Sequence, residues 1–271
     1  MTTTDLREAA RAAMVVTFDW MALGCERFPA DGASFTRNRS VPRIRDCNQV
    51  TDVTASTETE IERLLARADR EYEASPHRQF RVDFRTPPAF EARLIADGFE
   101  WDETLGLVLD GELTGEGPEH EIRPVETEAD WEAYGALHAL DWEAVGRTLP
   151  KPPDPEVWRS VGREIVVSRR QKTPPVRWWL AYYDGEPRAY FGSWEGNEGV
   201  GQVEDLFTHP DYRHGGLATA LIRHCVADCR AHGAGPVAIF ADARDTPKNM
   251  YRALGFRPVS VSRAYRKELR P

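Results

Sequence analysis

Residues 202–221 read QVEDLFTHPDYRHGGLATAL, and this stretch decides how the rest of the chain is interpreted. It predicts an apolar strand over residues 203–208, a glycine turn, and a helix that begins near Leu217. The first N–H groups of a helix have no partner within the helix, and the helix dipole attracts anions to that end. Glycine adds no Cβ that would keep ligand oxygen atoms away from the backbone. The stretch therefore predicts a phosphate-binding turn.

The composition is that of an ordinary globular protein, with 41% hydrophobic and 29% charged residues among 271. The formal net charge of -9 argues against nucleic-acid binding, which depends on dense Lys/Arg patches. No apolar run approaches the ~20 residues of a membrane span, and the N-terminus does not resemble a signal peptide. The cysteines form no C-x-x-C pair. We therefore expect a cytoplasmic protein that binds neither nucleic acid nor a membrane.

The hydrophobic periodicity along the chain predicts an α+β protein. Thr57 and Glu60 have the spacing of a capping box, and Asp130 is expected to cap a later helix. Helices are expected at residues 1–20, 57–74, 89–96, 130–140, 157–168, 217–232 and 247–254. Strands are expected at residues 80–84, 105–109, 122–125, 178–183, 188–194, 203–208, 237–241 and 259–267. The polar, Gly/Pro-bearing segment 113–120 is the best candidate for a linker between two domains.

Two motifs resemble those of the GNAT superfamily, the GCN5-related N-acetyltransferases. Residues 213–218, Arg-His-Gly-Gly-Leu-Ala, resemble the Q/R-x-x-G-x-G/A pyrophosphate loop of that family. Residues 251–256, Tyr-Arg-Ala-Leu-Gly-Phe, resemble its closing Y-x-x-L-G-F motif. Their order, with one helix and one strand between them, also matches. A Rossmann site would need a third glycine, which the turn lacks. The resemblance implies a mixed, mostly antiparallel, twisted sheet flanked by helices.

The first part of the chain looks like a second, degenerate copy of this unit. Residues 94–99, Leu-Ile-Ala-Asp-Gly-Phe, align with residues 251–256, but Leu94 stands where the second copy has Tyr251. No pyrophosphate loop occurs before residue 112. The resemblance therefore predicts two tandem copies: a degenerate GNAT-like domain at 1–112 without a CoA loop, a linker at 113–120, and a catalytic N-acetyltransferase domain at 121–271.

The resemblance also implies an acetyl-CoA site. Backbone N–H groups of the glycine turn would hold the CoA pyrophosphate, and Arg213 would add charge and shape the loop. The preceding strand edge would pair with the pantetheine arm as if it were another strand. An N–H of Leu206 or Phe207 would stabilise the oxyanion. The residues expected to bind acetyl-CoA are Leu206, Phe207, Thr208, Arg213, His214, Gly215, Gly216, Leu217, Ala218 and Thr219. No metal is expected.

The acceptor implied by the resemblance is an amine. Tyr251 matches the tyrosine of the family that protonates the departing CoA thiolate. Glu204 is the first candidate for the base and Asp205 the second. Strand alternation places these two carboxylates on opposite faces, so only one would point into the acceptor cleft. Water could also carry the proton away, with both carboxylates serving only as surface charges. Loops such as 149–155 would select the acceptor.

The predicted activity is therefore the transfer of an acetyl group from acetyl-CoA to a primary amine of a small molecule or peptide, by a monomer or homodimer. Two alternatives stay open. One is a non-catalytic acyl-CoA-binding or regulatory module that keeps the pyrophosphate loop but has no acceptor. The other is acyl transfer to a thiol or hydroxyl.

Overall fold

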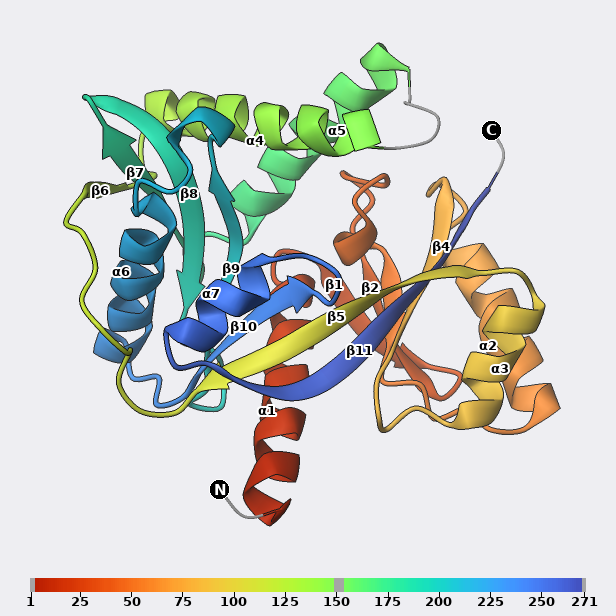
Figure 1. Cartoon of the computed structure of the whole chain (residues 1–271). Coiled ribbons are helices and arrows are strands. Elements are labelled where there is room, and N and C mark those ends of the chain that lie inside the picture. Colours follow the sequence, from red (N-terminus) through yellow and green to blue (C-terminus); the bar gives the residue numbers. More distant parts are fainter. Residues whose placement is uncertain (1–2, 149–153, 270–271) are drawn as a thin grey trace. The chain divides into compact units, whose positions relative to one another are not determined.

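The computed structural model describes residues 3–148 and 154–269 (Figure 1). Most of the loop 149–155, which we expected to help select the acceptor, lies outside the described residues. The chain divides into two compact units, Met1–Val108 with Phe240–Pro271, and Leu109–Ile239. Among the described residues, no helix combines the length and the apolar character needed to cross a bilayer.

The first unit is a sheet with helices α1 (Thr3–Ala22), α2 (Glu58–Glu71), α3 (Pro88–Ala96) and α7 (Pro247–Ala253). Its strands are β1 (Glu26–Ala30), β2 (Ala33–Arg37), β3 (Gln49–Thr51), β4 (His77–Val82), β5 (Glu100–Leu109) and β11 (Arg257–Glu268). They are hydrogen-bonded in the order β1-β2-β3-β4-β11-β5. The only parallel neighbours in this series are β3 and β4, where Val50 stands opposite Phe80.

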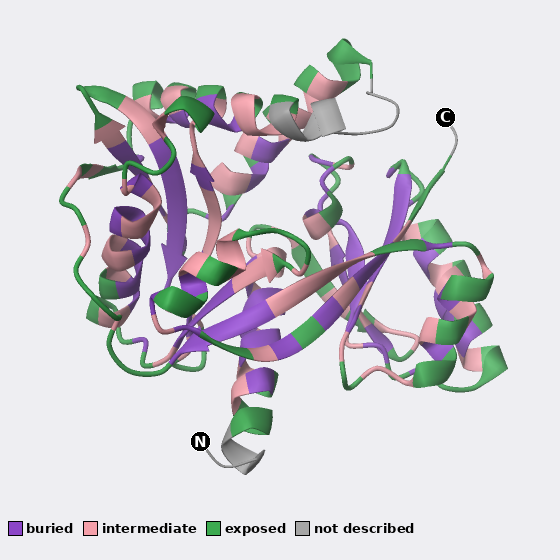
Figure 2. Ribbon diagram, in the orientation of Figure 1, coloured by how far each residue is buried: buried purple, intermediate pink, exposed green. Residues whose placement is uncertain are grey.

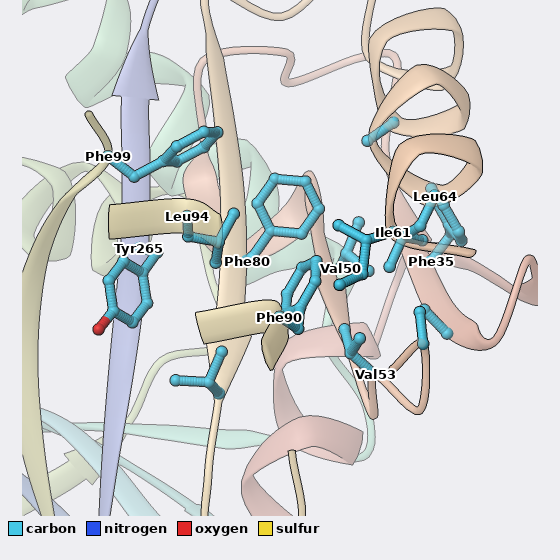
Figure 3. Close-up of a cluster of buried hydrophobic side chains, with 14 of the residues drawn as sticks. Phe35, Val50, Val53, Ile61, Leu64, Phe80, Phe90, Leu94, Phe99 and Tyr265 are labelled. Atoms are coloured by element: carbon cyan, nitrogen blue, oxygen red, sulfur yellow. The ribbon is translucent and has the colours of Figure 1, made fainter. Parts of the chain in front are cut away.

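Aromatic side chains pack among aliphatic ones in a core cluster of the first unit (Figure 3). The ring of Phe80 meets Phe90 and Phe99 edge-on, with centroids 5.5 and 5.6 Å apart. Leu94, which replaces the tyrosine of the second copy, is fully buried in this cluster. The position therefore contributes to packing in the first copy and offers no dissociable proton.

The second unit has helices α4 (Glu128–Thr148), α5 (Pro155–Gln171) and α6 (Leu217–Ala231). Its strands are β6 (Glu121–Pro124), β7 (Arg177–Tyr183), β8 (Glu186–Trp194), β9 (Gly201–Thr208) and the first half of β10 (Val237–Asp242). They run in the order β10-β9-β8-β7-β6, and β8 is buried along most of its length (Figure 2). Tyr190 of β8 packs on Tyr134 of α4, whereas Ser193 of β8 bonds to Asp228 of α6. Because residues three apart on a strand face opposite ways, α4 and α6 cover opposite faces of this sheet.

The same order of elements occurs twice. In β3-α2-β4-α3-β5 and again in β9-α6-β10-α7-β11, a helix joins two parallel strands, and a short helix leads to the next strand. The predicted α+β fold with a mostly antiparallel sheet is confirmed, and this repetition agrees with the predicted tandem copies.

The compact units do not follow the predicted boundaries. Strand β11 lies between β4 and β5 and pairs with both, so the end of the chain folds with its first part. The resemblance of the motif at 251–256 to the closing GNAT motif had assigned these residues to the second domain. The assignment of catalysis to residues 121–271 stays a prediction.

The N-terminal caps of α2 and α4 can be compared with those predicted from the sequence. The capping box of Thr57 and Glu60 is present as predicted. Asp130 was wrongly expected to be an N-cap, because Thr127 has that role. The Thr127 hydroxyl accepts a bond from the Asp130 N–H at 3.2 Å, and the Asp130 carboxylate accepts one from the Thr127 N–H at 2.8 Å. Asp130 is therefore the third residue of a capping box.

Candidate functional site

The glycine turn has an unusual backbone. His214 has φ +66° and Gly216 has φ +86°, so two residues of this short turn are left-handed. A non-glycine residue in that region costs on the order of 1–3 kcal/mol and tends to be found at functional sites. Gly216 is the N-cap of α6 and has no side chain to bond to the first N–H groups of the helix. Turns of this kind present backbone N–H groups to an anion.

The other end of the turn is attached to the strand before it. The Nε of Arg213 donates to the carbonyl of Thr208 at 3.3 Å. The ring of His209 accepts a bond from the Asp211 N–H at 3.2 Å and so caps the short 3-10 helix Pro210–Tyr212. The guanidinium of Arg188 lies 4.5 Å from the centre of the Tyr212 ring. Only the first of these contacts involves Arg213, and its role in shaping the loop stays a prediction.

Strand β9 separates from its parallel neighbour part of the way along. The β9–β10 ladder joins Gly201–Val203 to Val237–Ile239 and ends there. On its other side β9 stays paired with β8 as far as Thr208, which stands opposite Ala189. Within the described part of the second unit, the edge at Leu206–Thr208 thus has no ladder partner on the β10 side. An extended ligand with amide groups could pair there.

A β-bulge interrupts β9 at the two predicted base candidates. Tyr190 stands opposite Phe207 and Gly192 opposite Glu204, so Asp205 and Leu206 together face a single residue of β8. Asp205 takes φ +72° to allow this. A bulge breaks the alternation of side chains along a strand.

The bulge overturns the expectation that the two carboxylates lie on opposite faces. Glu204 stands opposite Gly192, two residues from Tyr190, and therefore faces the α4 side of the sheet. Asp205 faces the same side, because it bonds to residues of α4 and α5. The Glu204 carboxylate also accepts a bond from the Gln202 side chain at 3.1 Å.

Asp205 is held in a polar cluster. Its Oδ2 atom accepts bonds from Arg169 Nε of α5 at 2.7 Å and from the Tyr134 hydroxyl of α4 at 3.1 Å. Burial opposes ionisation of Asp205, but the Arg169 charge and both hydrogen bonds outweigh it and hold the pKa below its usual range. Asp205 is consequently an anion and a weak base at neutral pH.

The structure adds Asp141, which the sequence interpretation missed. Burial and the nearby charge of Asp205 raise the pKa of Asp141 to about 6, although Arg213 acts in the opposite direction. The residue follows Tyr134 and His138 on α4 at spacings of four and three, so the three share one helix face. His138 stacks on Tyr190, and its burial lowers its pKa to about 4. The i, i+4, i+7 spacing of these three residues could have indicated from the sequence that Asp141 lies on the same helix face as Tyr134 and His138.

Tyr251 lies on α7 and is only 5% exposed. Its ring centre is 6.3 Å from that of Phe256, the last residue of its motif. It belongs to a different compact unit from Glu204 and the glycine turn.

The two cysteines of α6 and Trp194 of β8 are buried. Cys225 and Cys229 are fully buried on α6, and the Cys229 thiol donates to the Trp194 carbonyl at 3.3 Å. Trp194 of β8 is 2% exposed, and the neighbouring Glu195 pairs with Arg177 at 2.9 Å. A hollow of about 610 Å³ lies between α4 and α5, but neither Asp205 nor the residues that bond to it line it.

Comparisons with known proteins agree with this geometry. Residues 131–256 match the model of the acetyltransferase (GNAT) family, a range that ends with the Tyr251–Phe256 motif. Among curated proteins, none matches the sequence significantly. A functionally unknown conserved protein from Staphylococcus epidermidis has a similar structure, with a TM-score of 0.70 and 14% identity over 93% of this chain and 98% of that one.

Two further solved structures share the fold. A GCN5-related N-acetyltransferase from Kribbella flavida has a TM-score of 0.64 and 17% identity, covering 96% of this chain and 95% of that one. A tandem GNAT protein from the clavulanic acid biosynthesis pathway has a TM-score of 0.56 and 15% identity, covering 82% and 76%. Acyl-CoA-dependent acyl transfer is the general activity that the family match supports. Residues 131–256 of this chain are therefore similar to the acetyltransferase (GNAT) family, and the chain shares its fold with a tandem GNAT protein.

Proposed function

We propose that this protein transfers an acetyl group from acetyl-CoA to a primary amine of a small molecule or peptide. The observation that carries the proposal is the arrangement along β9. A glycine turn with two left-handed residues follows the strand, the strand edge before the turn has no β10 ladder partner within the described part of the second unit, and two carboxylates lie on one face beside that edge.

The donor, acetyl-CoA, would bind through its diphosphate and the amide groups of its pantetheine arm. The CoA diphosphate lies against the N–H groups from His214 to Thr219, where the dipole of α6 favours negative charge. Arg213 adds a positive charge there. The pantetheine amides pair with the edge at Leu206–Thr208 and carry the thioester along β9.

In the transfer itself, the amine nitrogen attacks the thioester carbonyl carbon and forms a tetrahedral intermediate. The backbone N–H of Leu206 or Phe207 stabilises its oxyanion, and such a donor is worth about 3–4 kcal/mol. The nitrogen loses a proton to the proposed base, the C–S bond breaks and the amide is released. The CoA thiolate takes a proton for which Tyr251 is the proposed source, and solvent returns a proton to Tyr251.

The proposed base is Glu204, because Asp205 is bonded to Arg169 and its pKa is lowered. Three carboxylates, those of Glu204, Asp205 and Asp141, lie on the acceptor side. Two guanidinium groups oppose them, because Arg169 pairs with Asp205 and Arg213 lowers the pKa of Asp141. This excess of negative charge favours an acceptor that arrives as an ammonium ion. The amine must lose that proton before it attacks, since a lysine-like amine has a pKa near 10.4.

The test is CoA release from acetyl-CoA with amines, aminoglycosides, polyamines, amino acids and peptides as acceptors, each matched by a thiol and an alcohol. Turnover confined to amines supports the proposal, and turnover confined to thiols or alcohols rejects it. Tight acetyl-CoA binding without turnover on any acceptor would favour the non-catalytic module instead. A chain mass of 30.7 kDa or twice that value in solution would decide between monomer and homodimer.

A further inference from the structure

The predicted linker, residues 113–120, lies along α6 together with the two residues before it. We call residues 111–120 the strap. At its beginning, Arg230 donates to the carbonyl of Gly111 and pairs with the Glu112 carboxylate at 3.3 Å. Further along, Arg223 donates to the carbonyl of Thr114 at 2.7 Å and also to that of Gly115. Two arginines of one helix therefore bind the backbone of the strap.

The end of the strap lies on the glycine turn. His120 Nε2 is 2.9 Å from the carbonyl oxygen of Gly215. Pro118 lies so close to Gly216 that a Cβ added there would be 2.2 Å from the proline Cγ. A Cβ added at Gly117 would likewise lie 2.7 Å from Arg223 Nε. The last four residues of the strap thus fit closely against the start of α6.

The contacts on α6 follow the helical repeat. The strap meets Gly216, Thr219, Arg223 and Arg230, at spacings of three, four and seven, so they line one face. The strap runs along that face from the C-terminal end of the helix to its N-terminal turn, which is the turn of the proposed CoA diphosphate site.

The bond from His120 orients one peptide of that turn. A carbonyl oxygen can only accept, so Nε2 of His120 must donate. In a planar trans peptide the C=O and the following N–H point in opposite directions. With the Gly215 carbonyl directed at the strap, the N–H of Gly216 points away from it. That N–H is one of those assigned to the diphosphate.

We propose that the strap positions the diphosphate-binding turn, with His120 and Pro118 holding the Gly215–Gly216 peptide so that its N–H faces the CoA diphosphate. This inference rests on the proposed function. The carboxylates of the strap, Glu112, Glu116 and Glu119, are exposed to water, which screens their charge. The strap acts through its backbone, His120 and Pro118. It fixes the orientation of the Gly215–Gly216 peptide before the ligand binds.

The test measures acetyl-CoA affinity by calorimetry in three histidine variants of the full chain. His120→Ala removes the donor, and the dissociation constant should rise about three- to tenfold, as expected for one lost hydrogen bond. His120→Gln keeps an N–H donor and should restore affinity to within about twofold. His232→Ala is the matched control, because His232 also bonds a backbone carbonyl of α6, at 2.8 Å, but at the far end. It should leave affinity unchanged.

A second variant, Pro118→Ala, tests the inference independently in case His120→Ala does not fold. Pro118→Ala keeps the His120 bond but loosens the contact with Gly216, and it should weaken acetyl-CoA binding while leaving S-acetylpantetheine, which lacks the diphosphate, unaffected as a substrate. If the wild type binds acetyl-CoA and both His120→Ala and Pro118→Ala bind it equally well, the strap has no positioning role. Tighter binding by either variant would mean that the strap covers the site, and would also overturn the inference. A wild type that does not bind acetyl-CoA would refute the proposed function together with it.

Discussion

The Nε of Arg169 lies 2.7 Å from Oδ2 of Asp205, and this pair joins α5 to the bulge of β9. Both side chains are largely covered, with 11% and 22% of their surface exposed. The bulge and its ion pair together place Asp205 on the same side of the sheet as Glu204. Asp205, one of the two carboxylates predicted as a base, is therefore bound in an ion pair that joins α5 to β9.

Replacement of Asp205 tests this structural role. Asp205→Asn leaves the Arg169 charge without its partner and should lower the free energy of unfolding by about 1–3 kcal/mol. Glu156→Gln is the matched control, because Glu156 pairs with Arg159 at 2.7 Å on the surface, where water screens the pair, and its replacement should cost much less. Urea unfolding measures both. Equal effects of the two substitutions would show that the Asp205 pair is no more than a surface contact.

The role of Glu204 is tested by activity. Glu204→Gln keeps the side-chain size but removes the base, and kcat for the best amine should fall about 100-fold or more. The KM for acetyl-CoA should stay within about twofold, because the donor site lies on the backbone. Glu198→Gln, at an exposed turn before β9, serves as the control and should change neither constant. Unchanged turnover in Glu204→Gln would assign the proton to water.

The raised pKa of Asp141 predicts a pH-dependent effect on stability. The folded protein holds this proton more tightly than the unfolded chain, so wild-type stability falls as pH rises from the ordinary carboxyl range to about 6. Asp141→Asn carries no such charge. Above pH 7 it should be more stable than the wild type by about 1 kcal/mol once solvent screening is included.

Thermal unfolding between pH 4 and pH 7.5 checks this expectation. The stability difference between Asp141→Asn and the wild type should shrink as the pH falls through 6 and vanish near pH 4, where the wild-type carboxyl is protonated. A difference that stays constant over this range would show that the Asp141 carboxyl titrates normally.

Gly216 and Gly233 both have positive φ, so alanine substitutions at the two positions distinguish the cost of backbone strain from the cost of the contact with Pro118. Gly233, at the end of α6, has φ +98° and nothing within 4 Å of an added Cβ, so Gly233→Ala should cost only the left-handed penalty of about 1–2 kcal/mol. Gly216→Ala adds the contact with Pro118 and should cost at least about 1 kcal/mol more. It should also weaken acetyl-CoA binding, whereas Gly233→Ala should not. Equal costs and equal affinities would mean that the strap moves aside freely.

Much of this molecule could be predicted from local sequence signals. The helix after the glycine turn, the hairpin turn at Asp184-Gly185 and the capping box at Thr57 depend on residues close together in the chain. The two motifs at 213–218 and 251–256 were sufficient to predict the GNAT family that the comparison found. Local conformation and short motifs depend on neighbouring residues, so one sequence is enough to predict them.

Only the tertiary structure decided the features that join distant residues. The β9 bulge, which brings Asp205 to Arg169, depends on a register with β8 that strand alternation does not predict. The pairing of β11 with β4 and β5, and the binding of the strap by Arg223, join segments more than a hundred residues apart. The physical reason is that register, bulges and long-range hydrogen bonds are set by which surfaces pack together. That choice belongs to the folded chain as a whole and leaves no signal in any single stretch.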